Sequence, residues 1–182
     1  KTPDVEYVTP LPETISVETV LPTMGQLTDR NTYNLTEDQY AGVVGAGRTY
    51  DVQKSIALAY EDVGNSYPTG WSQQGECIMS VMRWITKAGG KWGAMGTPSN
   101  NYITATKVSP ENVQAGDVIQ YFSKTEPDSW NTGVHTVLIT GNNWDGTYRI
   151  VEANAKGPGL VTKDDKWVPK PPTGFEAVAY RF

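Results

Sequence analysis

The spacing of the apolar residues changes along the chain, and this change limits the folds that are open to it. Over residues 51–63 and again over residues 76–88, apolar side chains recur at helical spacing, which predicts two helices. Gly64 is expected to end the first helix, and Gly89 with Gly90 the second. We expect the second helix to begin near Glu76, which would place Cys77 in its first turn.

After about residue 116 the chain contains short segments rich in β-branched residues, which predict strands. These segments cover residues 118–122, 134–140, 148–155, 159–163 and 176–182. The polar loop at residues 142–146 contains Asp145-Gly146 and predicts a hairpin between the second and third strands. Helices first and strands second predict an α+β domain, with N-terminal helices packed on a C-terminal antiparallel sheet.

The first 30 residues differ in composition from the rest of the chain. They include four prolines, and no basic residue lies between Lys1 and Arg30. This composition predicts an extended acidic linker or stalk over residues 1–30. Residues 31–182 are expected to form the globular domain, with its core from about residue 50. Within that domain, residues 36–39 read as a capping box that opens a short helix ending near residue 44.

The charge of the chain is acidic, with a formal net charge of −5 at pH 7. The absence of a Lys/Arg cluster argues against nucleic acid as a partner. No apolar run approaches the roughly 20 residues of a membrane span. Lys1-Thr2-Pro3 is not a natural chain start, so we expect either a mature fragment or a piece chosen for expression, from which a leader or anchor could have been removed. We expect a monomer that needs no cofactor and no metal.

The chain contains one cysteine and one histidine, and both are candidates for chemistry. At a helix N-terminus, free backbone N–H groups and the helix dipole would favour the thiolate of Cys77. Taken alone, a single Cys is more often a small buried apolar side chain. His135 favours the catalytic interpretation, because a nucleophilic thiol needs a base and no other His is present. The alternative is a packed core His on the strand face of Val137 and Ile139.

A third polar group would be needed to orient the imidazole. Glu152 and Asn154 are two positions apart in the strand after the hairpin, so the period of two places them on one face. Pairing across the hairpin would bring that face beside His135. The alternative for Glu152 is an exposed side chain on an edge strand.

Four segments occur in an order that resembles one known family. They are Gly75-Glu76-Cys77, Gly116-Asp117-Val118, Val134-His135-Thr136-Val137 and Glu152-Ala153-Asn154. Together they resemble the CHAP family of cysteine, histidine-dependent amidohydrolases/peptidases, over about residues 50–182. The resemblance implies a papain-like α+β fold in a secreted, cell-wall-associated bacterial enzyme. It also implies hydrolysis of a peptidoglycan amide, either the muramoyl–L-alanine bond or a bond within the stem or cross-bridge peptide.

By position, the resemblance implies a role for four residues. Cys77 would be the nucleophile, His135 the general base and then acid, Glu152 the orienting group and Asn154 an accessory polar group. The related NlpC-like peptidases usually carry Asp-Cys-Ser-Gly at the nucleophile, which the sequence from Glu76 does not match. Some CHAP enzymes bind calcium through acidic residues ahead of the Cys, but residues 65–76 contain a single acidic residue, so no such calcium is expected.

Five further residues are candidates for contact with a substrate. Gln73 or Gln74 could complete an oxyanion hole with the backbone N–H of Cys77, although for either amide taken alone a solvated position in a loop is the more common case. Trp71 and Trp130 precede Cys77 and His135 and could either flank a cleft or fix the loops in place. Tyr67 is a weaker candidate of the same kind.

Two other classes of function stay open from the sequence. One is a hydrolase of the same fold that acts on an amide outside the cell wall. The other is an inactive relative that binds a peptide or partner protein through an aromatic cleft. The enzyme hypothesis requires that the sulfur of Cys77 lie beside the ring of His135, with a carboxylate behind the ring, and that the sulfur be open to solvent.

Overall fold

The computed structural model describes residues 50–67, 73–92, 96–102 and 104–182. The elements in this part of the chain are α3 (Val52–Asp62), α4 (Gln73–Lys87), β1 (Thr106–Val108), the short 3₁₀ helix η4 (Pro110–Asn112), β2 (Val118–Ser123), β3 (His135–Asn142), β4 (Tyr148–Ala153), β5 (Val161–Trp167) and β6 (Phe175–Arg181). The linker expected over residues 1–30 and the short helix expected after Thr36 lie outside the described residues.

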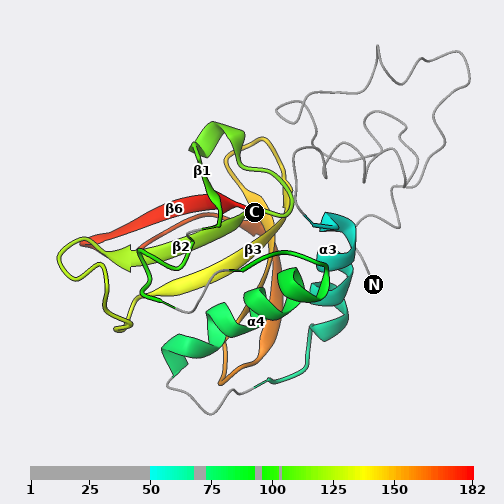
Figure 1. Cartoon of the computed structure of the whole chain (residues 1–182), viewed down its shortest axis with the longest axis horizontal. Coiled ribbons are helices and arrows are strands. Elements are labelled where there is room, and N and C mark those ends of the chain that lie inside the picture. Colours follow the sequence, from blue (N-terminus) through cyan, green and yellow to red (C-terminus); the bar gives the residue numbers. More distant parts are fainter. Residues whose placement is uncertain (1–49, 68–72, 93–95, 103) are drawn as a thin grey trace, which may run out of the picture.

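The strands form one antiparallel sheet in the order β1-β6-β2-β3-β4-β5. Helix α4 packs on β3 and β4 and also contacts α3, and Figure 1 shows α4 running beside β3. The predicted α+β architecture, with helices before an antiparallel sheet, is therefore confirmed. A bilayer-spanning helix is absent from the residues that the structure describes.

Side chains from the two faces of the sheet belong to two separate apolar clusters. On the helix face, Val118 and Leu138 join a core that includes Val81 and Ile85 of α4. On the other face, a second cluster forms from residues of the same strands, including Ile139. Alternate residues of one strand thus serve different clusters, as the pleat of a strand requires.

Both predicted helices are present, but the second begins earlier than expected. Helix α4 starts at Gln73, three residues before Glu76. Gly75 suggested a loop, yet a glycine is tolerated in a first turn where Gln73 and Gln74, both good helix formers, precede it. Cys77 is therefore the fifth residue of α4, and the prediction that it lies in the first turn is wrong.

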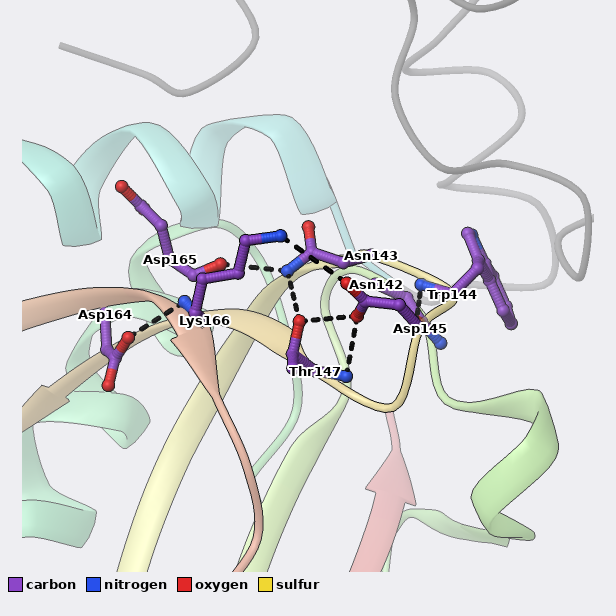
Figure 2. A network of polar contacts seen from close by, with 8 residues as sticks. All are labelled: Asn142, Asn143, Trp144, Asp145, Thr147, Asp164, Asp165 and Lys166. Carbon is purple, nitrogen blue, oxygen red and sulfur yellow. Dashed lines mark hydrogen bonds and ion pairs between the residues drawn. The ribbon is translucent and has the colours of Figure 1, made fainter.

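The hairpin predicted around residues 142–146 joins β3 to β4, with Asn142 paired to Tyr148. Figure 2 shows the polar contacts that hold this loop. The side-chain oxygen of Asn142 accepts a hydrogen bond from the backbone N–H of Trp144 at 2.8 Å. The carboxylate of Asp145 accepts from the backbone N–H and the hydroxyl of Thr147 at 2.9 and 2.6 Å. The loop fixes the register in which β3 meets β4.

Two edge strands differ from the sequence-based expectation. Strand β5 covers Val161–Trp167 rather than residues 159–163. Gly159 has a left-handed φ of 63° and belongs to the turn before the strand, and the exposed charged run at residues 163–166 hid the strand signal. Strand β1 is exposed and three residues long, too short to leave a pattern in the sequence.

The Gly116-Asp117 turn ties the entry of β2 to the end of β6. Asp117 is 0% exposed, and its carboxylate accepts two hydrogen bonds at 3.0 Å from Nε and Nη2 of Arg181. It also accepts a bond from the backbone N–H of Gln114 at 2.9 Å. Gly116 has a φ of 89°, and a Cβ there would meet Val52 of α3 at 2.9 Å. The motif is thus explained by packing and ion pairing.

Candidate active site

A histidine and a glutamate meet where β3 begins and β4 ends. The ring Nε2 of His135 lies 2.8 Å from Oε2 of Glu152. In the strand register Glu152 is opposite Val137, so the contact runs diagonally across the β3–β4 pair. Diagonal neighbours are within reach of long side chains. Sequence reasoning anticipated this neighbourhood from the hairpin alone.

Cys77 approaches the same histidine from α4. Its thiol interacts with the ring of His135, and its Sγ lies 3.9 Å from Oγ1 of Thr136, the next residue of β3. Because Glu152 occupies Nε2, the nitrogen of the ring left for the sulfur is Nδ1. The sole thiol, the sole imidazole and a carboxylate are therefore contributed to one place by three separate elements.

The electrostatic surroundings favour a charged imidazole. Burial by itself lowers the pKa of His135, but hydrogen bonds with Cys77 and Glu152 and their negative charges outweigh it, and the pKa is raised to about 10. An opposite charge close by favours the charged form of a titrating group. The arrangement therefore suits a thiolate–imidazolium pair backed by a carboxylate.

Access to the sulfur differs from the expectation. Cys77 is 1% exposed, whereas the side chains of His135 and Glu152 are 19% and 10% exposed. The requirement that the sulfur be open to solvent is not met in this conformation. The ring of His135 is the most exposed of the three groups. A substrate can reach the sulfur only after the atoms that cover it move.

The backbone N–H of Cys77 does not suit the oxyanion role given to it. As the fifth residue of α4, Cys77 has an N–H group within the helical i→i−4 ladder, and the free N–H groups of a helix belong to its first four positions. Any such donors lie ahead of Cys77. The side chains of Gln73 and Gln74, the other proposed donors, lie outside the described residues.

Asn154 does not share the strand face of Glu152. Strand β4 ends at Ala153, and Asn154 has a left-handed φ of 68°, so the strand period no longer applies to it. Its side-chain oxygen accepts a hydrogen bond from the backbone N–H of Gly159 at 2.9 Å. This contact closes the turn that leads into β5.

The aromatic candidates make contacts within the protein. The indole N–H of Trp130 donates to the carbonyl of Gly96 at 3.0 Å, which fixes two loops together. The hydroxyl of Tyr67 donates to Asp62 at 2.9 Å, and the guanidinium of Arg83 lies 4.2 Å from the centre of its ring. These contacts favour packing roles for both aromatics. Trp71 lies outside the described residues.

A buried polar group beside the site was missed by the sequence reasoning. Gln120 of β2 is 0% exposed, and its Oε1 accepts hydrogen bonds at 2.6 Å from the hydroxyls of Thr136 and Tyr102. Its one sequence signal is a polar residue inside the apolar run at 118–122. That signal does not identify partners on another strand and in a distant loop.

A metal site does not emerge from the described residues. Within them, no three His, Cys, Asp or Glu side chains gather in a group that could hold a metal ion. The chemistry open to Cys77, His135 and Glu152 is that of a nucleophile, a base and an orienting carboxylate.

No protein-family model matches the sequence, and no curated protein matches it. Two solved structures to which the chain is similar are of Ly7917, one of them described as the crystal structure of Ly7917 with the hydrolyzing product of MDP. Their sequence identities to this chain are 18% and 17%, and their TM-scores are 0.45 and 0.48. Each alignment covers 71% of this chain and 62% of Ly7917, so the chain spans less than two thirds of that protein. A similarity this weak carries no argument about function.

Proposed function

We propose that the chain is a cysteine-dependent hydrolase of the CHAP type that cleaves an amide bond of bacterial peptidoglycan. The observation that carries the proposal is the 2.8 Å contact between His135 and Glu152, made on a ring that also interacts with the sole thiol, Cys77. A nucleophile, its base and a group that orients the base are the parts that acyl transfer by a thiol needs.

The first half of the reaction forms a thioester. The thiolate of Cys77 attacks the amide carbonyl carbon, forming a carbon–sulfur bond while the carbonyl electron pair moves onto oxygen. When the carbonyl re-forms, the carbon–nitrogen bond breaks and the imidazolium of His135 gives its proton to the departing amine. Glu152 keeps the ring in one orientation and stabilises its positive charge through the bond to Nε2.

The second half returns the enzyme to its starting state. A water molecule gives a proton to His135 and attacks the thioester carbon, and the carbon–sulfur bond then breaks. The products are a carboxylic acid and the Cys77 thiolate beside a protonated His135, which is the starting pair. One water is consumed for each amide cleaved, and no other reactant is needed.

The substrate class follows from the CHAP resemblance of the four sequence segments. It supports the muramoyl–L-alanine bond or a bond in the stem or cross-bridge peptide as the target, and a secreted, cell-wall-associated enzyme. The observed order of helices before an antiparallel sheet is compatible with the papain-like fold of that family. The net charge of −5 gives no long-range attraction to an anionic wall, so binding depends on short-range contacts.

A specific observation favours a second candidate, an inactive or non-wall-directed relative that binds a peptide or partner. Cys77 is 1% exposed, as expected for a residue that packs rather than reacts. A groove of about 540 Å³ on the sheet face away from α4 is lined by residues that include Ile119, Tyr148 and Pro169. Such a surface could bind a ligand without using the thiol.

Digestion of purified peptidoglycan separates the two candidates. The wild-type chain is expected to release new amino termini, which mass spectrometry would assign to one bond, while Cys77→Ala releases none. Cys77→Ser is the matched control, because it keeps the size of the side chain but supplies a weaker nucleophile. Equal release by wild type and Cys77→Ala, or release by neither, would reject the proposal. Alkylation by iodoacetamide at neutral pH, compared with the denatured chain, reports thiol reactivity independently of the substrate.

A further inference from the structure

Gln120 has every hydrogen-bonding position occupied, and this determines which way its amide faces. Its Nε2 donates to the backbone carbonyls of Tyr121 at 2.8 Å and His135 at 3.0 Å. Carbonyl oxygens only accept, so the amide cannot be turned around. Its Oε1 must then accept from both hydroxyls that lie 2.6 Å away, those of Thr136 and Tyr102.

The hydrogen of the Thr136 hydroxyl is therefore committed to Gln120. A hydroxyl has one hydrogen and two lone pairs, so Thr136 can present only a lone pair to any other neighbour. One such neighbour is the hydroxyl of Tyr102, and another is Cys77, whose Sγ lies 3.9 Å from Oγ1 of Thr136. Both Thr136 and Gln120 are 0% exposed, and water cannot replace either partner.

A lone pair of Thr136 that faces the sulfur of Cys77 has opposite effects on the thiol and on the thiolate. It accepts the S–H of the thiol and repels the thiolate, so Thr136 favours the protonated form. The imidazolium of His135 has the opposite effect, because an opposite charge close by favours the charged form of a group. Glu152 is hydrogen-bonded to the ring of His135. Tyr102 stays protonated, because burial raises its pKa well above the usual range. Glu76, a buried acidic neighbour on α4, is common to all the variants compared below.

We propose that Thr136 is a positioning residue that holds the sulfur of Cys77 in its buried position and weakens its thiolate, with Gln120 fixing the polarity of the contact. The nucleophile becomes accessible when the sulfur leaves Thr136 and keeps its contact with the protonated ring of His135. This inference rests on the proposed function, since it assigns a resting position to the sulfur of the proposed nucleophile. It also explains why the sulfur is buried in a site whose other parts are in place.

The test is the pH dependence of alkylation of the single thiol by iodoacetamide. In Thr136→Val, which keeps the shape but removes the hydroxyl, the midpoint of reactivity should fall by about half a pH unit. Thr136→Ser retains the hydroxyl and should keep the wild-type midpoint. Tyr102→Phe is the matched control, because it removes a hydroxyl that contacts Gln120 and Thr136 without removing the contact of Thr136 to sulfur. It should lower the thermal stability and leave the midpoint in place.

The outcomes separate this inference from the proposed function. A wild-type thiol with the reactivity of an ordinary cysteine overturns the proposed function. A reactive wild-type thiol whose midpoint is unchanged or raised in Thr136→Val overturns only the role of Thr136, since a raised midpoint would mean that the hydroxyl donates to the thiolate. If Thr136→Val does not fold, Thr136→Ala removes the same hydroxyl at a smaller volume and carries the same expectations.

Discussion

The Nε2 of His135 and the Oε2 of Glu152 lie 2.8 Å apart, although Glu152 is paired in register with Val137. The thiol of Cys77 interacts with the same ring. Because Glu152 contacts Nε2, the other ring nitrogen, Nδ1, is left for the sulfur. The geometry has the form of a base held between a nucleophile and an orienting acid.

Replacing Glu152 by Gln should lower the rate with little effect on the fold. The amide has the same shape but no charge to stabilise the imidazolium, and we expect kcat on peptidoglycan to fall about 100-fold or more. The release of amino groups measures kcat, and the thermal midpoint checks folding. Glu176→Gln on β6, which is exposed, is the matched control and should behave as wild type. A wild-type kcat in Glu152→Gln would remove the orienting role.

His135 should make stability depend on pH in the alkaline range. Burial lowers its pKa, but the contacts with Cys77 and Glu152 raise it to about 10, above the unfolded value of about 6.5. A raised folded pKa gives a stabilisation that is complete below about pH 6.5 and lost as the pH rises through about 10. Denaturant unfolding from pH 6 to about pH 10 should therefore show falling stability, and His135→Gln should flatten the curve. Equal slopes in the two proteins would contradict the charged pair.

Asp62 should anchor the end of α3 to α4. Its carboxylate accepts hydrogen bonds from the indole of Trp84 at 2.7 Å, from Tyr67 at 2.9 Å and from Arg83 at 3.1 Å. Burial raises its pKa, but these bonds outweigh it and the pKa is lowered. We expect Asp62→Asn to cost about 1–3 kcal/mol near pH 7, measured by urea unfolding.

The pH dependence of this effect follows from the sign of the shift. The stabilisation is present above the unfolded pKa of about 3.9 and is lost as the pH falls through the lower folded value. The difference between wild type and Asp62→Asn should therefore shrink in acid. Glu61→Gln, one residue earlier and exposed, is the control and should change little. A difference that is constant with pH would show that charge is not involved.

Arg181 should stabilise the fold by neutralising the buried carboxylate of Asp117. Removing it leaves a carboxylate that is 0% exposed without the guanidinium that neutralises it. We expect Arg181→Met to reduce the free energy of unfolding by about 3 kcal/mol. The double variant Asp117→Asn/Arg181→Met should regain part of this loss, because no charge is then left buried. If the double variant is less stable than Arg181→Met, the buried carboxylate is not the cause.

The spacing of apolar residues along the chain was sufficient to predict most of the helices and strands. Helix α3 lies within the range predicted from its apolar stripe, and β2, β3, β4 and β6 agree with their predicted segments to within about two residues at each end. The hairpin loop also predicted that β4 would bring Glu152 near His135. These features depend on the spacing of residues along the chain, which can be read from the sequence alone.

Other features depend on residues that are distant in the sequence, and only the tertiary structure decided them. The start of α4 at Gln73 removed the expected oxyanion donor, and the end of β4 at Ala153 turned Asn154 away from the face of Glu152. The distant partners of Gln120 come from another strand and from a loop. Cys77 is buried, with its sulfur beside Thr136. Periodicity shows which face of an element is apolar, but it does not show which polar atoms meet when distant elements pack, because that depends on their relative placement in space.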